Sequence, residues 1–245
     1  MKRIALIGVT SSIGEEIARE CSVPNVRFYL TGRDSKRLAQ IGADLEIRGA
    51  QSTITEHVDL TDCSCTYGLS ARAAKALGGL DIVIFVAGQL PDQDELNWDS
   101  QRLRETMEIN TTTAMVLLNE TAAFFEQQGH GQIVAIGSVA GDRGRATNYA
   151  YGAAKGALEI FLSGLRQRLS RRGVKVLLVK PGFVDTPMTA AFKKGPLWAS
   201  PERVAKDIVR AMETGKSVIY TPWWWRWIML VIRLIPEPIF VRLRF

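Results

Sequence analysis

The chain has 245 residues, of which 47% are hydrophobic and 23% are charged. That length allows one large α/β domain or two small ones, and the composition excludes a disordered or collagen-like protein. The net charge of +6 favours an anionic partner, such as a nucleotide phosphate or a phospholipid surface. Nucleic acid is a weaker candidate, because no basic helix or aromatic stacking motif accompanies the charge.

The cysteine content argues against both a metal centre and a disulfide framework. The three cysteines are Cys21, Cys63 and Cys65, and the chain has two histidines. An odd number of cysteines without a paired CxxC spacing is typical of the reducing cytoplasm. The apolar run near the N-terminus is too short for a signal peptide. We therefore expect an intracellular protein that holds no metal ion.

Short β-branched runs alternate with helical stretches as far as Lys180. The runs IALIG, DIVIFVAG and VKVLLVKPG are apolar almost throughout, as is typical of strands covered on both faces of a parallel sheet. This alternation predicts βαβ units and a single doubly wound α/β domain. The predicted strands are 3–8, 26–30, 52–57, 81–87, 132–138, 175–180 and 217–220.

A long loop interrupts this alternation after the sixth predicted strand. The stretch 181–200 contains three prolines and two glycines and is longer than a routine connection. Because it follows the carboxyl end of a strand, it is predicted to cover a substrate.

The segment GVTSSIG, Gly8 to Gly14, follows the first predicted strand and leads into a helix. Gly8 suits a tight turn, Gly14 lets the helix pack close to the strand, and Ser12 is the predicted N-cap. The N–H groups of the helix start would then face the pyrophosphate of a dinucleotide. A plain strand–turn–helix connection is the alternative. The residues of this segment predicted to contact the cofactor are Gly8, Thr10, Ser11, Ser12, Ile13 and Gly14.

The end of the second predicted strand bears on the choice of nucleotide. A site for the unphosphorylated cofactor usually has a carboxylate here, whereas this chain has Thr31, with Arg33 two residues later. A guanidinium can bind a 2′-phosphate through two hydrogen bonds, so NADP is predicted. Alternatively, Arg33 is a solvated residue at the start of a helix whose predicted N-cap is Asp34.

The segment YGAAK, Tyr151 to Lys155, carries the strongest chemical signal, with Ser138 thirteen residues upstream of the tyrosine. Residues four apart share a helix face, so Tyr151 and Lys155 project together. A nearby ammonium, together with the positive ring of an oxidised nicotinamide, lowers the pKa of a phenol from its usual value of about 10, which helps the tyrosine to exchange protons. Ser138 is placed to hold a carbonyl oxygen, and Asn110 is predicted to face inward from a long helix.

Together these segments resemble the short-chain dehydrogenase/reductase family over essentially the whole chain. The resemblance includes the pair Asp59-Leu60, Val86-Ala87-Gly88 in place of the usual N-A-G, and the segment PGFVDT from Pro181 to Thr186. It implies a Rossmann fold, a nicotinamide cofactor and a homo-oligomer. The further cofactor-binding residues it implies are Asp59, Leu60, Ala87, Gly88, Tyr151, Lys155, Pro181, Gly182, Val184 and Thr186.

The resemblance also implies a catalytic tetrad. Tyr151 would be the proton donor, and Ser138 would orient the carbonyl. Lys155 would hold the nicotinamide ribose, and Asn110 would anchor a water of the proton relay. The sequence departs from the family pattern at Ser12, where the loop usually has a glycine, and at Val86; neither change removes a catalytic group.

Two arginines follow the predicted serine, in the segment GDRGRATNY. Arg143 and Arg145 are placed to bind a phosphate of the substrate, or else they are solvated charges.

The segment 222–245 is predicted to be an apolar, basic extension of a domain formed by residues 1–221. Thirteen residues from Trp223 to Ile235 are too few for a bilayer, which needs about 20. We predict a helix that lies in the plane of a membrane surface, because the segment combines tryptophans with the arginines Arg226, Arg233, Arg242 and Arg244. A core helix or a subunit interface is the alternative.

Two stretches, YGAAKGALEIFLSGLRQRL and the C-terminal WRWIMLVIRLIPEPIFVRL, also resemble another group of proteins. These are the reductases that complete the epimerisation of decaprenylphosphoryl ribose to arabinose. That resemblance implies NADPH-dependent reduction of a 2-keto pentose carried on a polyprenyl phosphate, with a partner flavoenzyme that forms the ketone. Alternatives are a reductase of 3-ketoacyl or other hydrophobic ketones, and a non-enzymatic NADP-sensing protein.

Overall fold

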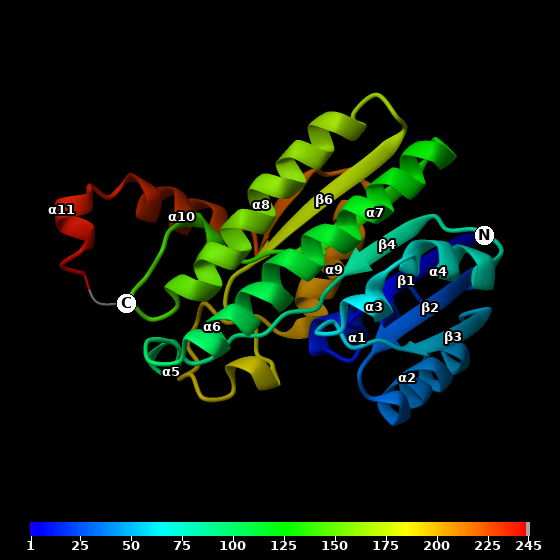
Figure 1. Cartoon of the computed structure of the whole chain (residues 1–245), viewed down its shortest axis with the longest axis horizontal. Helices are drawn as coiled ribbons and strands as arrows, with labels where there is room; N and C mark the ends of the chain where they lie inside the picture. Colours follow the sequence, from blue (N-terminus) through cyan, green and yellow to red (C-terminus); the bar gives the residue numbers. More distant parts are fainter. Residues whose placement is uncertain (244–245) are drawn as a thin grey trace.

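The computed structural model describes residues 1–243 and has the predicted α/β architecture in a single domain (Figure 1). Seven parallel strands form one sheet in the order β3-β2-β1-β4-β5-β6-β7. Arg244 and Phe245 of the predicted extension lie outside the described residues. The strands are β1 (Lys2–Ile7), β2 (Val26–Gly32), β3 (Ser52–His57), β4 (Ile82–Phe85), β5 (Gly131–Ile136), β6 (Val174–Pro181) and β7 (Val218–Thr221).

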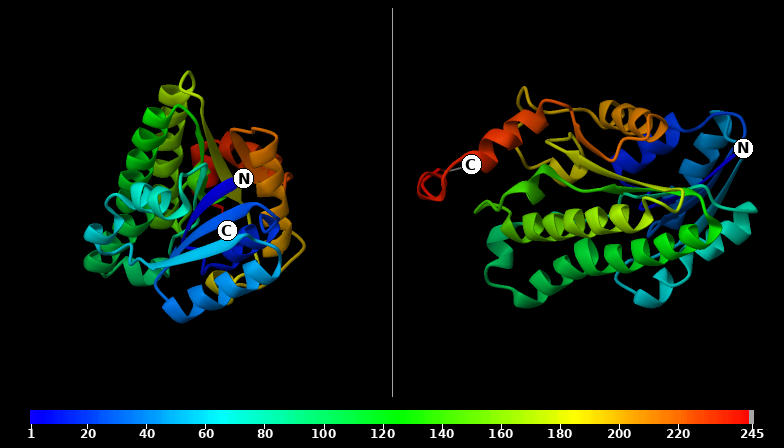
Figure 2. Two further views of the ribbon diagram at one scale, coloured as in Figure 1. Left: turned by 90° about the vertical axis from the view of Figure 1, so that its right-hand side faces the viewer. Right: turned by 90° about the horizontal axis from the view of Figure 1, so that it is seen from above.

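The central strands are apolar throughout because helices cover both faces of the sheet. In β1, Ile4 and Leu6 enter the core cluster on one face, and Ala5 and Ile7 enter the cluster on the other. Figure 2 shows the two helical layers. One layer contains α1 (Ser12–Glu20), α2 (Ser35–Ile47) and α9 (Pro201–Glu213). The other contains α4 (Leu69–Leu77), α7 (Thr113–Gln128) and α8 (Tyr149–Leu169).

Shorter elements complete the chain. They are α3 (Cys63–Thr66), α5 (Gln93–Leu96), α6 (Ser100–Met107), the π-helix η1 (Glu108–Thr112), the 3₁₀ helices η2 (Val139–Asp142) and η3 (Pro187–Thr189), α10 (Trp225–Leu234) and α11 (Glu237–Phe240).

The strand order reverses direction between β1 and β4, and this reversal positions the site. From β1 the chain proceeds outward through β2 and β3, and from β4 it proceeds the other way. Ligands of doubly wound sheets bind in the crevice at the carboxyl ends of the two strands that flank such a point. The loops that begin at Gly8 and Val86 both leave the sheet there, and the Val86 N–H donates to the Ile7 carbonyl.

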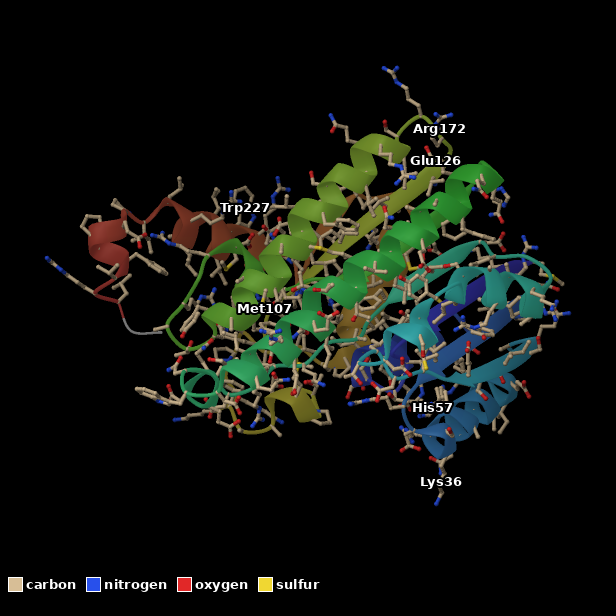
Figure 3. The ribbon with its side chains drawn as sticks, in the orientation of Figure 1. Lys36, His57, Met107, Glu126, Arg172 and Trp227 are labelled. Atoms are coloured by element: carbon tan, nitrogen blue, oxygen red, sulfur yellow. The ribbon has the colours of Figure 1, made fainter. Side chains whose placement is uncertain are left out.

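The C-terminal segment is partly buried in the protein. On α10, Trp225 and Met229 are buried against Val139, whereas Trp227 is 56% exposed and points away from the sheet (Figure 3). α10 and α11 project at the end of the molecule opposite the N-terminus (Figure 1). Within residues 1–243, no helix is long and apolar enough to cross a bilayer.

Candidate active site

The loop after β1 has the compact form that a dinucleotide pyrophosphate needs. Gly8 has φ +85°, and a side chain at Gly14 would bring Cβ within 2.9 Å of the Gly8 carbonyl oxygen. The N-cap of α1 is Ser11, whose Oγ accepts from the Gly14 N–H at 3.1 Å, so the predicted cap at Ser12 is wrong by one residue. Ser12 instead begins the helix, and the N–H groups of a first helical turn have no partner within the helix itself.

A cavity of about 230 Å³ lies beside this loop, at the ends of β1, β2 and β4. Arg33 is exposed at its edge. The Thr61 backbone N–H donates to Asp59, which, together with the nearby Arg33 charge, lowers the pKa of that carboxyl. The predicted cofactor residues that line this cavity are Gly8, Thr10, Ser11, Arg33, Asp59, Leu60, Ala87 and Gly88.

A second cavity, of about 310 Å³, continues from the first, because Thr10, Ser11 and Gly88 line both. A side chain at Gly88 would place Cβ 2.9 Å from Asn110 Oδ1 and 3.2 Å from Lys155 Nζ, so glycine at this position leaves both side chains in place. The two cavities together fit an extended dinucleotide lying across the carboxyl edge of the sheet. The predicted cofactor residues that line the second cavity are Ser12, Ile13, Tyr151, Lys155, Pro181, Gly182, Val184 and Thr186.

Ser138, Tyr151 and Lys155 all line this second cavity. Tyr151 and Lys155 come from the first turns of α8, and the Lys155 Nζ lies 5.7 Å from the centroid of the Tyr151 ring. Lys155 Nζ donates to the Ile136 carbonyl at 3.0 Å, which fixes the ammonium against the end of β5. Ser138 is the N-cap of η2, and its Oγ accepts from the Ala140 N–H.

Burial shifts the pKa values of both Tyr151 and Lys155. It raises the pKa of Tyr151 to about 12, although a hydrogen bond with Ser138 acts in the opposite direction. It lowers the pKa of Lys155 to about 8. The lowered tyrosine pKa predicted from the sequence includes the charge of an oxidised nicotinamide, whereas in the protein alone desolvation of the phenolate dominates and raises this pKa. Tyr151 is therefore a neutral phenol with a proton to give at neutral pH.

Asn110 lies in the π-helix η1, which joins α6 to α7 without a break, so the long helix predicted around it is present but contains a π-helical turn. Its side chain is fully buried, and its Nδ2 donates to the carbonyls of Gln89 and Thr106. Its Oδ1 accepts from the Gln89 N–H at 2.9 Å. A π-bulge of this kind is frequent at functional sites. Here it turns the amide toward the loop after β4, which it braces beside Lys155.

The loop after β6 forms the far wall of the second cavity. Phe183 stacks on Trp198 with ring centroids 5.4 Å apart and meets Trp225 of α10 edge to face at 5.0 Å. The bridge between Val184 and Ala199 closes the loop on itself. The C-terminal segment therefore supports the wall of this cavity through Trp225.

The two arginines after Ser138 have different surroundings. Arg143 does not line the cavity: its Nη1 donates to the carbonyls of Ile232 and Ile235 at 2.6 Å, and its Nη2 pairs with Glu237 at 2.7 Å. The predicted role of Arg143 in substrate binding is corrected by these contacts, since its donors stabilise the end of α10. Arg145 lines the cavity.

A buried charge cluster supports the segment that carries Ser138. Lys180 of β6 is 1% exposed and donates to Glu159 of α8 at 2.7 Å and to Asp142 of η2. Burial alone would lower the pKa of Lys180, but the hydrogen bonds to the two carboxylates raise it. The Tyr220 hydroxyl also donates to Asp142. These bonds fix η2 between the sheet and α8.

Several residues that line the second cavity had no role predicted from the sequence, among them Asn148 and Phe183. Asn148 precedes α8, its side chain makes no cap hydrogen bond, and its Oδ1 is buried without a partner among the described residues. Phe183 lies within PGFVDT, where no spacing rule marks it. Only its contacts with the distant Trp225 place it at the cavity.

Comparison with known proteins identifies the family of the chain. The family model for short chain dehydrogenase matches residues 2–196. An uncharacterized oxidoreductase of Mycobacterium tuberculosis is 33% identical over 240 residues, which cover 98% of this chain and 96% of the relative. An uncharacterized oxidoreductase of Streptomyces coelicolor is 30% identical over 246 residues, with 99% and 96% covered.

Solved structures show the same fold. A short-chain dehydrogenase from Sphingobium yanoikuyae, in complex with NADPH, has a TM-score of 0.84 at 23% identity and covers all of this chain and 97% of its own. A short-chain type dehydrogenase/reductase from Mycobacterium ulcerans has a TM-score of 0.80 at 23% identity, with 89% and 87% covered. The chain belongs to the short-chain dehydrogenase/reductase family and is an oxidoreductase that uses a nicotinamide cofactor.

Proposed function

We propose that the protein is an NADPH-dependent reductase of a ketone carried on a lipid-like molecule. The observation that carries this proposal is the convergence of Ser138, Tyr151 and Lys155 on one cavity continuous with the nucleotide cleft. The same cavity has apolar walls from Leu90, Phe183 and other side chains, which suits a hydrophobic substrate.

The chemistry requires a hydride at the carbonyl carbon and a proton at the carbonyl oxygen. A bound NADPH supplies the hydride. Ser138 donates a hydrogen bond to the carbonyl oxygen, which orients it beside the phenol. Tyr151, kept neutral by burial, gives its proton to that oxygen as the alcohol forms. Lys155 holds the ribose and stabilises the phenolate left behind, and Asn110 keeps the loop at Gly88 in place beside it.

The choice of NADPH over NADH rests on Arg33. Its guanidinium lines the cavity at the end of β2, where a ribose phosphate is expected, and no carboxylate stands at Thr31 to compete for the ribose hydroxyls. A bidentate bond between guanidinium and phosphate favours the phosphorylated cofactor.

The substrate that we propose is a 2-keto pentose linked to a polyprenyl phosphate, reduced to the arabinose epimer after a partner flavoenzyme has formed the ketone. The apolar cavity and the cationic Arg145 within it support this choice. A 3-ketoacyl thioester is the second candidate, since the same apolar walls suit an acyl chain.

The outer face of α10 supports attachment to a membrane. Trp223, Trp227, Val231 and Leu234 are all more than half exposed. Arg226 and Arg233 are exposed among them, which gives an apolar and cationic surface of the kind that binds anionic lipid in its plane. The segment 222–245 then holds the cavity near the bilayer that contains the substrate.

The substrate assignment is tested by NADPH oxidation with each candidate. The purified protein is given the polyprenyl-phosphate 2-keto pentose and, separately, a 3-ketoacyl thioester, each with NADPH or NADH. We expect the highest kcat/KM with the keto sugar and NADPH. A higher kcat/KM with the thioester would select the alternative, and equal use of NADH would contradict the role of Arg33.

The membrane assignment is tested with vesicles of phosphatidylglycerol and phosphatidylcholine. Trp227→Ser combined with Leu234→Ser is expected to weaken binding roughly tenfold or more, because two exposed apolar side chains are lost. Trp98→Ser is the matched control, since Trp98 is 92% exposed on another part of the surface. The outer face of α10 would instead be a subunit interface if the unaltered protein forms dimers but does not bind vesicles, and if the double variant no longer forms dimers.

A further inference from the structure

Two polar atoms in the wall of the second cavity lack partners. Arg145 Nε and Asn148 Oδ1 are both buried and have no hydrogen-bond partner within residues 1–243. Both residues line the cavity that also contains Ser138 and Tyr151. Buried polar atoms are nearly always paired in proteins, so an unpaired donor and an unpaired acceptor beside a reactive group indicate a ligand.

The positive charge of the Arg145 guanidinium has few hydrogen-bond acceptors in the protein. Its hydrogen bond in the described structure is from Nη2 to Met229 Sδ at 3.3 Å, and a thioether is a weak acceptor. Burial lowers the pKa of Arg145, and the charge of Asp142 acts against that shift. The Asp142 carboxylate itself is bonded to Lys180 and Tyr220. Arg145 thus keeps a positive charge that no carboxylate of residues 1–243 pairs with.

The two residues are held together by the backbone. The Asn148 N–H donates to the Arg145 carbonyl at 3.1 Å, in the segment that connects Ser138 with Tyr151. A group bound by this turn would therefore share one wall with the groups that hold the reacting carbonyl. Arg143, two residues from Arg145, has its donors occupied by the carbonyls of Ile232 and Ile235 and by Glu237 of α11, and does not compete for the same ligand.

We propose that Arg145 and Asn148 form a subsite for an anionic, hydroxylated part of the substrate. Arg145 binds a phosphate or carboxylate, and Asn148 Oδ1 accepts from a hydroxyl next to it. The inference rests on the proposed reductase function and deepens it, because it names the substrate class as ketones that carry an anion close to the carbonyl. A 3-ketoacyl thioester has no such anion and would leave Arg145 unpaired.

The first test needs no variant. The protein is assayed with NADPH and either 4-acetylbenzoate or its methyl ester, which differ in the negative charge. We expect kcat/KM for the acid to exceed that for the ester by roughly 10-fold or more, as one charge-assisted hydrogen bond provides. Equal values, or a preference for the ester, would overturn the proposal.

The second test changes the guanidinium. Arg145→Met keeps a long apolar side chain beside Met229, Arg145→Lys keeps the charge, and Arg171→Met is an exposed control with the same loss of charge. We expect Arg145→Met to remove the preference for the acid mainly through KM, Arg145→Lys to keep part of it, and the control to keep all of it. An unchanged preference in Arg145→Met would overturn the assignment.

A binding measurement separates this inference from the reductase itself. With the nucleotide site saturated by NADP, phenyl phosphate is titrated calorimetrically into the unaltered protein and the Arg145→Met variant. Binding that weakens roughly 10- to 100-fold in the variant supports the subsite even if no ketone is reduced, in which case the proposed function alone fails. No binding to the unaltered protein, or equal binding to both, would refute the subsite whatever the protein reduces.

Discussion

Replacing Lys155 with methionine is predicted to cost activity and to change how stability depends on pH. Burial lowers the pKa of Lys155 from 10.5 to about 8. Each pKa unit corresponds to about 1.4 kcal/mol, so keeping the ammonium buried below pH 8 costs roughly 3 kcal/mol of folding free energy. Methionine removes that cost but leaves the Ile136 carbonyl without its donor, a loss of about 1–3 kcal/mol.

The sign of the pH effect follows from proton binding. Between about pH 8 and 10.5 the unfolded chain keeps the Lys155 proton and the folded chain has lost it, so the free energy of unfolding rises with pH. Lys155→Met lacks this contribution, whereas all other groups titrate alike in both proteins. The stability of the unaltered protein relative to the variant should therefore increase by roughly 3 kcal/mol across that window.

Urea unfolding followed by tryptophan fluorescence at several pH values between 7 and 10.5 measures this difference. The variant should also show no detectable reductase activity at any of them. A difference in stability that stays constant with pH would show that the Lys155 pKa is not lowered by burial, and the electrostatic description of the site would then be wrong.

Three further substitutions test separate parts of the molecule. Arg33→Asp should raise the KM for NADPH roughly 10- to 100-fold and leave that for NADH nearly unchanged, and a parallel loss for both cofactors would contradict the phosphate role. Lys180→Met should lower the free energy of unfolding by about 3–5 kcal/mol in urea melts, because Asp142 and Glu159 lose the cation that they share, whereas the exposed Lys175→Met should change it little. Arg143→Met should make the segment after Trp225 sensitive to limited proteolysis, and unchanged resistance would mean that its bonds to α10 are dispensable.

The sheet could be predicted from the sequence because its strands are buried on both faces. Runs such as IALIG have no polar side to place in water, and every predicted strand is present with bounds within two residues. The spacing of Tyr151 and Lys155 predicted their shared cavity for a similar reason, since one helix fixes both. The local spacing of residues is enough to predict a site where a single helix or strand carries all of its residues.

The features that could not be predicted from the sequence depend on contacts between residues far apart in the chain. Whether Arg143 or Arg145 faces the cavity depends on α10, far along the chain, which accepts the Arg143 donors. The C-terminal helix is apolar around most of its circumference, so its sequence could not tell that Trp225 packs inward while Trp227 faces out. At Asn110, an extra residue in the helical turn gives η1, a local distortion that the amphipathic pattern does not encode.

In the proposed reaction, Tyr151 protonates a carbonyl oxygen as NADPH is oxidised. Single-turnover oxidation of bound NADPH, followed at 340 nm with the best ketone substrate, measures that step directly in the unaltered protein and in Tyr151→Phe. The phenyl ring keeps the packing but has no proton to donate, so we expect a rate at least about 100-fold lower with unchanged NADPH affinity. A rate within tenfold of the unaltered protein would contradict the mechanism.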